Sequence, residues 1–288
     1  MTAAPGRGWH EVGPTDEVLA AVAARTDEVL AAVAARLAAA GCVAAAEEAA
    51  AFVGAAPDEA TLEAWLRRRE QGEPQPWITG TVAFCGRSLH VAPGVFVPRS
   101  QTQDLARRAA EVLPEHGRAV DLCTGIGAIA AYLRSQVPAC HVVGVDVDPR
   151  AAACARRNGV PAVAADLAAP LERPAHGVDV VTAVAPYVPT DELQLLPSDV
   201  QRYEPRHALD GGADGLALVR RVVAEASRLL RRDGWLLLEV GADQDQVLAP
   251  TLAAHGFDLA AAWRDDEGDL RGLAARAAEP RANGGASR

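Results

Sequence analysis

The chain contains no lysine, and all 28 of its basic side chains are arginines. A catalytic or Schiff-base lysine is therefore excluded. The basic residues are also outnumbered by 38 acidic ones, which leaves a formal net charge of −10. Because binding to nucleic acid depends on neutralising phosphates with a basic surface, a nucleic-acid substrate is not expected.

Long apolar runs are missing as well. No stretch reaches the roughly 18 consecutive apolar residues of a transmembrane helix, and the N-terminus lacks the basic flank and apolar segment of a signal peptide. We therefore expect a soluble, cytoplasmic protein with no membrane partner. Cysteine is scarce, and none of the 5 residues stands in a C-x-x-C pair or at metal-ligand spacing from a histidine. Free thiols and no metal site are expected.

The most informative stretch runs from Arg118 to Arg150. A short apolar run that contains Asp121 near its end leads into a glycine-containing turn and an alanine-rich helix, and a second apolar run then stops at Asp146. The order of strand, turn, helix and strand predicts a nucleotide-binding half-fold.

The turn reads Asp121-Leu-Cys-Thr-Gly125-Ile-Gly127 and lacks the third glycine of the dinucleotide pattern G-x-G-x-x-G. An acid at the strand end disfavours phosphate but suits an ammonium group, and the two glycines let the backbone approach a compact ligand. Asp146, at the end of the next strand, is placed to accept from two ribose hydroxyls. S-adenosylmethionine (SAM) carries both groups and is the expected cofactor. The alternative is a degenerate Rossmann turn with a surface acid.

Strands and helices continue to alternate through the rest of the chain. With seven expected strands, the pattern predicts an α/β, Rossmann-like fold preceded by a small helical domain. A third strand ends at Asp166, whose carboxylate would accept from the adenine amino group unless it is a solvated loop acid. A β-hairpin is expected to pair Trp77–Phe84 with Arg87–Val91. The predicted domains are a flexible N-terminus (1–14), a helical N-terminal domain (15–74), a β-hairpin linker (75–93), a SAM-binding domain (94–278) and a disordered tail (279–288).

The N-terminal region contains an internal repeat, because DEVLAAVAAR at 16–25 recurs at 27–36. Eleven residues make three helical turns, so equivalent valines of the two copies return to nearly one helix face. One long helix and two short helices broken near Thr26 both agree with the repeat. It is either a duplicated helix of the small domain or a surface for homo-oligomer formation.

Several motifs together resemble one family. A P-R-x-x-T motif begins at Pro98, a P-Y pair begins at Pro186 after the fourth strand, and EPRHALDGGADG occupies residues 204–215. With the helical domain and the hairpin, these motifs resemble the HemK/PrmC family of SAM-dependent methyltransferases, which act on a glutamine of peptide-chain release factors. The resemblance covers about residues 40–278. It implies an α/β fold with a class I (Rossmann-like) seven-stranded SAM-dependent methyltransferase domain at 94–278.

The resemblance implies which residues bind the cofactor and the methyl acceptor. The cofactor site would comprise Asp121, Cys123, Thr124, Gly125, Gly127, Asp146, Asp166, Leu167, Ala183 and Val184. The acceptor would contact Phe96, Arg99, Thr102, Val184, Ala185, Pro186 and Tyr187.

Two positions depart from the family pattern. The family motif is N-P-P-Y, in which the Asn oxygen and a main-chain carbonyl accept from the substrate amide, but this chain has Val184 in place of the Asn. Gln103 also stands where the family usually has Glu. Valine accepts no hydrogen bond, so a buried amide would be left half-satisfied. This favours a repurposed enzyme that methylates a small, aromatic, indole-type acceptor in specialised metabolism.

The sequence is also compatible with other functions. The first alternative is the family's own reaction, N5-methylation of a release-factor glutamine, and the second is a non-catalytic SAM-binding protein. A nucleic-acid methyltransferase is the least favoured.

Catalysis by such an enzyme depends mainly on alignment. Methyl transfer from a sulfonium is an in-line displacement, so the protein must orient the acceptor, exclude water and remove a proton where there is one. Tyr187, Glu204 and His207 follow the fourth strand and are the candidate proton acceptors. Each has an alternative role: Tyr187 stacks on the acceptor, Glu204 braces a loop, and His207 lies on the surface.

Overall fold

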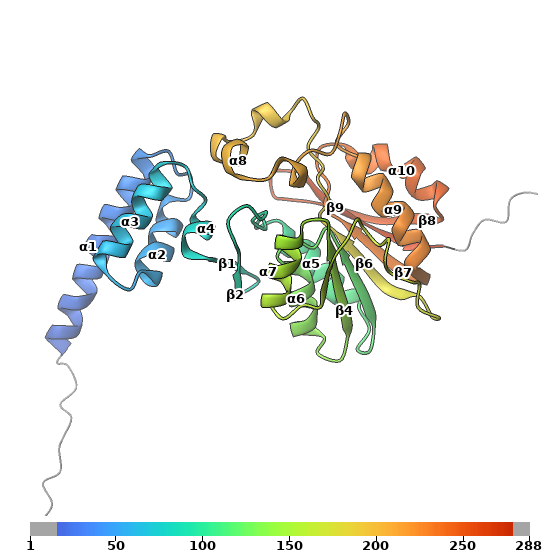
Figure 1. Cartoon of the computed structure of the whole chain (residues 1–288), viewed down its shortest axis with the longest axis horizontal. Coiled ribbons are helices and arrows are strands. Elements are labelled where there is room, and N and C mark those ends of the chain that lie inside the picture. Colours follow the sequence, from blue (N-terminus) through green and yellow to red (C-terminus); the bar gives the residue numbers. More distant parts are fainter. Residues whose placement is uncertain (1–15, 279–288) are drawn as a thin grey trace, which may run out of the picture. The chain divides into compact units, whose positions relative to one another are not determined.

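The computed structural model describes the backbone of residues 16–278 and the side chains of residues 26–278. The predicted flexible N-terminus (1–14) and disordered tail (279–288) lie outside these ranges. The chain divides into two compact units at the bond between Gln75 and Pro76 (Figure 1). Each unit has its own packing and is described separately.

The first unit is helical and contains α1 (Asp16–Ala39), α2 (Ala45–Ala55) and α3 (Glu59–Glu70). The repeat lies within α1, which is one continuous helix through Thr26. In its second copy Val33 is buried whereas Val29 is exposed, and the side chains of the first copy are outside the description. Arg36 of α1 forms ion pairs with Glu63 and Glu70 of α3. The second copy of the repeat therefore already packs within its own unit.

A short helix and a hairpin begin the second unit. The expected strand Trp77–Phe84 is wrong in its first half, because α4 (Gln75–Thr79) includes Trp77. Pro76 occupies the first turn of that helix, where its missing N–H costs no hydrogen bond. The hairpin pairs β1 (Thr81–Phe84) with β2 (Arg87–His90). Phe84 and Leu89 contribute to the core of the second unit, so the hairpin is integrated into that unit.

The second unit is built on a mixed sheet of 7 strands in the order β5-β4-β3-β6-β7-β9-β8. The first five in that order run parallel, and β9 is antiparallel to both of its neighbours. The predicted α/β class I fold is confirmed. The strands are β3 (Arg118–Leu122), β4 (His141–Asp146), β5 (Ala162–Ala164), β6 (Val178–Ala183), β7 (Leu230–Leu238), β8 (Phe257–Arg264) and β9 (Leu270–Ala277).

Helices cover both faces of this sheet (Figure 1). One buried cluster joins a sheet face to α5 (Thr102–Val112), α6 (Ala128–Gln136) and α7 (Pro149–Arg157), and a second joins the other face to α9 (Ala217–Leu229) and α10 (Gln244–Ala254). Strand β3 is flanked by β4 on one side and β6 on the other. The connections diverge at this point, so a crevice is expected at the carboxyl ends of β3 and β6.

The connection from β6 to α9 contains structure that the sequence did not predict. Two 3-10 turns, Leu193–Leu195 and Arg206–Ala208, flank the short helix α8 (Ser198–Tyr203). The chain then returns to its starting point, since the N–H of Val188 donates to the carbonyl of Leu209 at 3.1 Å and the N–H of Gly211 donates to the carbonyl of Val188 at 2.8 Å. This return brings residues 204–209 next to the segment after β6.

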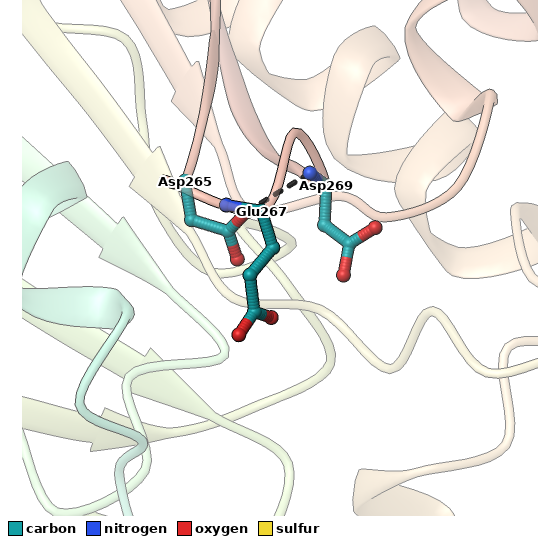
Figure 2. A group of neighbouring side chains, drawn as sticks. All are labelled: Asp265, Glu267 and Asp269. Carbon is teal, nitrogen blue, oxygen red and sulfur yellow. Dashed lines mark hydrogen bonds between the residues drawn. The ribbon is translucent and has the colours of Figure 1, made fainter.

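Three acidic side chains, Asp265, Glu267 and Asp269, gather on the loop between β8 and β9 (Figure 2). The Asp265 carboxylate accepts from the backbone N–H groups of Glu267 and Asp269, at 3.0 and 2.9 Å. It also pairs with Arg271 at 2.5 Å. The cluster is therefore accounted for as a turn held by its first carboxylate. Across residues 16–278, no helix has the length and apolar character needed to cross a membrane.

Candidate active site

A cavity of about 340 Å³ opens at the carboxyl ends of β3, β4 and β6. We call it the Asp146 cavity. Its wall includes six of the ten residues predicted to bind the cofactor, namely Cys123, Gly125, Asp146, Asp166, Leu167 and Val184. Thr124, Gly127 and Ala183 line neither this cavity nor the second one described below.

The two glycines of the turn have different surroundings. Both have left-handed backbones, with φ of 55° at Gly125 and 78° at Gly127. A Cβ at Gly125 would meet nothing within 4 Å, whereas a Cβ at Gly127 would lie 2.9 Å from the Cβ of Ala155. Gly125 thus presents bare backbone to open space at the cavity, and Gly127 lets α6 and α7 approach one another.

Asp146 is held by backbone donors. Its two carboxylate oxygens accept from the N–H of Gly125 at 2.8 Å and from the N–H of Asp148 at 2.9 Å. Burial raises the pKa of Asp146, and these two N–H groups oppose the rise. A carboxylate offers about four lone-pair sites, so two remain for hydroxyl hydrogens of a ligand. The turn and the strand end therefore orient one acceptor group into the cavity.

Asp121 is more deeply buried, at 1% exposure. Its two oxygens accept from the hydroxyls of Thr124 at 2.5 Å and Thr182 at 2.6 Å. Burial raises the pKa of Asp121 to about 6, and the two hydroxyl groups oppose the rise. Asp121 lines a narrow cavity of about 40 Å³ that also contacts Gly125 and Val184. Asp121 therefore orders the turn through its hydrogen bond with Thr124, and its carboxylate could contact a ligand only through this narrow cavity.

Two further acids lie on the wall of the Asp146 cavity. The exposed carboxylate of Asp166 pairs with Arg221 at 2.8 Å. Asp148 accepts from the N–H of Arg150 at 2.8 Å and so caps the first turn of α7. The sequence singled out Asp166 but not Asp148, although Asp148-Pro149 is a recognisable start of a helix.

A second cavity, of about 290 Å³, lies beside the first. We call it the Tyr187 cavity. Six of the seven predicted acceptor-binding residues line it: Phe96, Arg99, Val184, Ala185, Pro186 and Tyr187. Four residues line both cavities, namely Phe96, Val184, Pro186 and Ala208. Val184 and Phe96 also line the narrow cavity above Asp121, so the three spaces meet at these two side chains.

A buried carboxylate that the sequence did not single out underlies the Tyr187 cavity. Glu239 follows β7 directly and is 2% exposed. It accepts from the hydroxyl of Thr102 at 2.6 Å, from the hydroxyl of Tyr187 at 3.1 Å and from the side-chain amide of Gln101 at 3.5 Å. Burial raises the pKa of Glu239, and these three donors oppose the rise. Predicted acceptor residue Thr102 thus contacts Glu239, away from the Tyr187 cavity.

The three candidate proton acceptors are not brought together. Tyr187 lines the second cavity, and burial raises the pKa of its hydroxyl above the ordinary value for tyrosine. His207 is half-exposed on the Asp146 cavity, with its Nε2 3.9 Å from Asp148. Glu204 lines neither cavity: its side chain is 2% exposed and pairs with Arg99 at 2.8 Å. Burial raises the pKa of Glu204, and the Arg99 guanidinium opposes the rise.

Comparisons with known proteins identify relatives of this chain. Residues 119–203 match the model of a family described as a methyltransferase domain. The release factor glutamine methyltransferase of Mycobacterium leprae is 39% identical over 224 residues, covering 73% of this chain and 77% of that protein. The one from Geobacter sulfurreducens is 37% identical over 196 residues, covering 66% of this chain and 68% of that protein.

A solved structure of a methyltransferase from Pyrococcus furiosus is similar in fold. It has a TM-score of 0.50 at 16% sequence identity, and the match covers 68% of this chain and 91% of that one. At this identity the likeness supports the fold alone.

The names of these relatives overturn the expectation of a small, indole-type acceptor, and with it the expected small-molecule partner and the assignment to specialised metabolism. That expectation depended on Val184 alone. It assumed that one side chain must supply the acceptor for a substrate amide, whereas the cavity beside Val184 also contains polar groups from other segments, among them Gln101 and Tyr187. The absence of one acceptor is therefore weak evidence on the substrate when the rest of the cavity is unknown.

Proposed function

Because the chain belongs to the HemK/PrmC family of release factor glutamine methyltransferases, which use SAM, we propose that it methylates the side-chain amide nitrogen of a glutamine in a peptide-chain release factor. The observation that carries the proposal is the pair of cavities that meet at Phe96 and Val184. A methyl donor in one cavity and a glutamine side chain in the other would meet at this shared wall.

The Asp146 cavity suits SAM. Open space above Gly125 leaves room for a ligand against bare backbone. The spare lone pairs of Asp146 fit two ribose hydroxyls, and the apolar wall formed by Val95, Val147 and Leu167 fits an aromatic base. We assign these residues to the cofactor, together with Cys123 and Asp148 on the same wall.

The Tyr187 cavity suits the side chain of a glutamine. Its wall is mostly apolar, which fits the two methylene groups, and its polar side chains are Arg99, Gln101 and Tyr187. Arg99 is neutralised by Glu204, with 2.8 Å between the guanidinium and the carboxylate. The cavity therefore offers hydrogen bonds to a neutral amide without presenting an unpaired charge.

The chemistry needs orientation more than a strong base. Bound SAM supplies a methyl group on a positively charged sulfur; the N–CH₃ bond forms as the S–CH₃ bond breaks, and the nitrogen then releases one proton. A nitrogen that has just gained a methyl group is strongly acidic, so water can take this proton. Burial raises the pKa of Tyr187, which suits its hydroxyl to donating a hydrogen bond and not to removing a proton. Alignment of the amide is the protein's main contribution.

The test is methylation of a purified bacterial release factor by the full chain with SAM, followed by tandem mass spectrometry. The proposal predicts a mass gain of one CH₂ group on a single glutamine side chain. The matched control is a release factor in which that glutamine is replaced by glutamate, which should gain no mass. Methyl transfer to both acceptors, or to neither, would contradict the proposal.

A further inference from the structure

Among the described residues, the Tyr187 cavity is lined by one side-chain carboxamide, that of Gln101, and Val184 lines the same cavity. We propose that the side-chain oxygen of Gln101 accepts a hydrogen bond from the NH₂ group of the substrate glutamine and so fixes the nucleophilic nitrogen. The inference rests on the proposed function, since it assigns the recognition of a primary carboxamide within that site.

The orientation of Gln101 follows from its neighbours. Its Nε2 lies 3.5 Å from a carboxylate oxygen of Glu239 and 3.4 Å from the hydroxyl oxygen of Tyr187. A carboxylate only accepts, and the Tyr187 hydroxyl already donates to the same oxygen of Glu239 at 3.1 Å. Both neighbours therefore require a donor from Gln101, so its NH₂ end faces them and its oxygen faces away.

Glu239 is itself held firmly. Its other oxygen accepts from the Thr102 hydroxyl at 2.6 Å, and the side chain is 2% exposed. The orientation of Gln101 is thus set by a buried, fixed group and not by solvent. Glu239 acts as a positioning residue, because it reaches the acceptor cavity only through Gln101 and Tyr187.

The Gln101 oxygen has no competing donor in the part of the chain whose side chains are described. The residue directly precedes α5, and its side chain caps no backbone N–H of that helix. It is half-buried and lines the cavity. An acceptor that is oriented but unused by the protein is available to a ligand.

The other polar side chains on the described cavity wall are less suited to this role. The Arg99 guanidinium has no acceptor atom, and it pairs with Glu204. The Tyr187 hydroxyl donates to Glu239 and accepts from Gln101, which leaves its oxygen at most one acceptor site. Gln101 is therefore the side chain best suited to compensate for the missing acceptor at Val184. Its oxygen would also repel a carboxylate, which predicts discrimination of glutamine from glutamate.

The test uses two substitutions in the full chain. Gln101→Leu keeps the approximate size of the side chain but removes its oxygen, and no helix cap is lost. We expect kcat/KM for the release factor to fall by about 10–100-fold, with SAM affinity within about twofold of the wild type. Adding Val184→Asn to Gln101→Leu supplies a new acceptor on the same cavity and should recover about tenfold or more of that loss.

Gln103→Leu is the matched control. Gln103 is two positions further on and bonds to the N–H of Cys85 and to Arg107, at 3.3 and 3.2 Å. It lines neither cavity, so its loss should change kcat/KM by less than about twofold. A purely structural role of Gln101 would give a loss that Val184→Asn does not restore.

The outcomes separate the inference from the function on which it depends. A wild type that methylates the release factor while Gln101→Leu retains full kcat/KM overturns the inference alone. A loss in Gln101→Leu that Val184→Asn leaves unchanged also overturns it. A wild type without activity on the release factor overturns the proposed function and this inference together.

Discussion

The two cavities that meet at Phe96 and Val184 are built in different ways. The Asp146 cavity takes most of its polar groups from one stretch of about fifty residues, 121–167, and from backbone N–H groups at strand ends. The Tyr187 cavity is assembled from three separate segments, around residues 96–101, 184–188 and 196–209. The carboxylate of Glu239, which contacts the cavity residues Gln101 and Tyr187, is held by side chains and not by backbone.

This difference bears on what each site can tolerate. Backbone donors persist through most substitutions, so a cofactor site built on them keeps its form while side chains change. A network of side-chain hydrogen bonds, in contrast, changes whenever one of its residues is substituted. Recognition of the acceptor can therefore move from one residue to another, as we propose for Val184 and Gln101, while the cofactor site stays the same.

The largest expected effect is on the cofactor side. Asp146→Ala removes the acceptor of the Gly125 N–H and the proposed acceptor of two ribose hydroxyls. Charge-assisted bonds are worth about 1.5–3 kcal/mol each, so SAM affinity should fall by about 100-fold or more. Calorimetric titration with SAM measures this. Asp146→Asn, which keeps the shape of the side chain, should show a smaller loss. Equal SAM affinity in wild type and Asp146→Ala would show that the cofactor binds elsewhere.

A second effect concerns Asp121, which lines the narrow cavity that also contacts Phe96 and Val184. The pKa of Asp121 is raised from 3.8 to about 6, so the folded state binds this proton more tightly than the unfolded state. The resulting stabilisation is full below about pH 4 and is lost as the pH rises through 6, which amounts to about 2–3 kcal/mol of unfolding free energy.

Urea unfolding between about pH 4 and pH 7 tests this sign. Asp121→Asn has no proton to release, so its stability should decline less over this window than that of the wild type. The difference between the two curves isolates Asp121 from the other carboxyl groups. Parallel curves would mean that Asp121 has an ordinary pKa and is hydrated.

The glycines of the turn give a smaller, paired effect. Gly127→Ala places a Cβ 2.9 Å from Ala155 at φ 78°, and it should lower the unfolding free energy by about 2 kcal/mol. In Gly125→Ala the new Cβ meets no neighbour, so the unfolding free energy should fall by only about 1 kcal/mol, the cost of the left-handed backbone. Its methyl group enters the space proposed for the ligand, however, and should weaken SAM binding about tenfold. Denaturation and SAM titration of both variants measure these two effects. A larger loss of stability in Gly125→Ala, together with a larger loss of SAM affinity in Gly127→Ala, would contradict the prediction.

The same contrast explains what could be read from the sequence. The seven-stranded fold and the turn followed by Asp146 depend on local patterns, namely apolar runs and acids at strand ends, and these were predictable. Glu239 obeys the same rule, since it directly follows the apolar end of β7, and applying the rule to every strand would have found it. Gln101 carries no such signal, because its role depends on Glu239 and Tyr187, which are distant in sequence.

The short elements between β6 and α9 were also not predictable. α8 spans 6 residues, too few to show a helical period. Glu204 was singled out as a candidate base from its position after the fourth strand, but its burial against Arg99 depends on how this connection returns over the sheet. Local pattern gave the position of the residue in the chain, and tertiary packing determined its environment.

The central claim is that the Asp146 cavity binds SAM and the Tyr187 cavity binds the acceptor. It is tested most directly by measuring both SAM affinity and kcat/KM for the release factor in two variants, Asp146→Ala and Tyr187→Phe. Tyr187→Phe removes the hydroxyl that donates to Glu239 at 3.1 Å and keeps the ring. It should lower kcat/KM about 3–10-fold at saturating SAM and leave SAM affinity unchanged, whereas Asp146→Ala should weaken SAM binding about 100-fold. If Tyr187→Phe weakened SAM binding as strongly as Asp146→Ala does, the two cavities would form one binding site, in contradiction to the separate roles proposed for them.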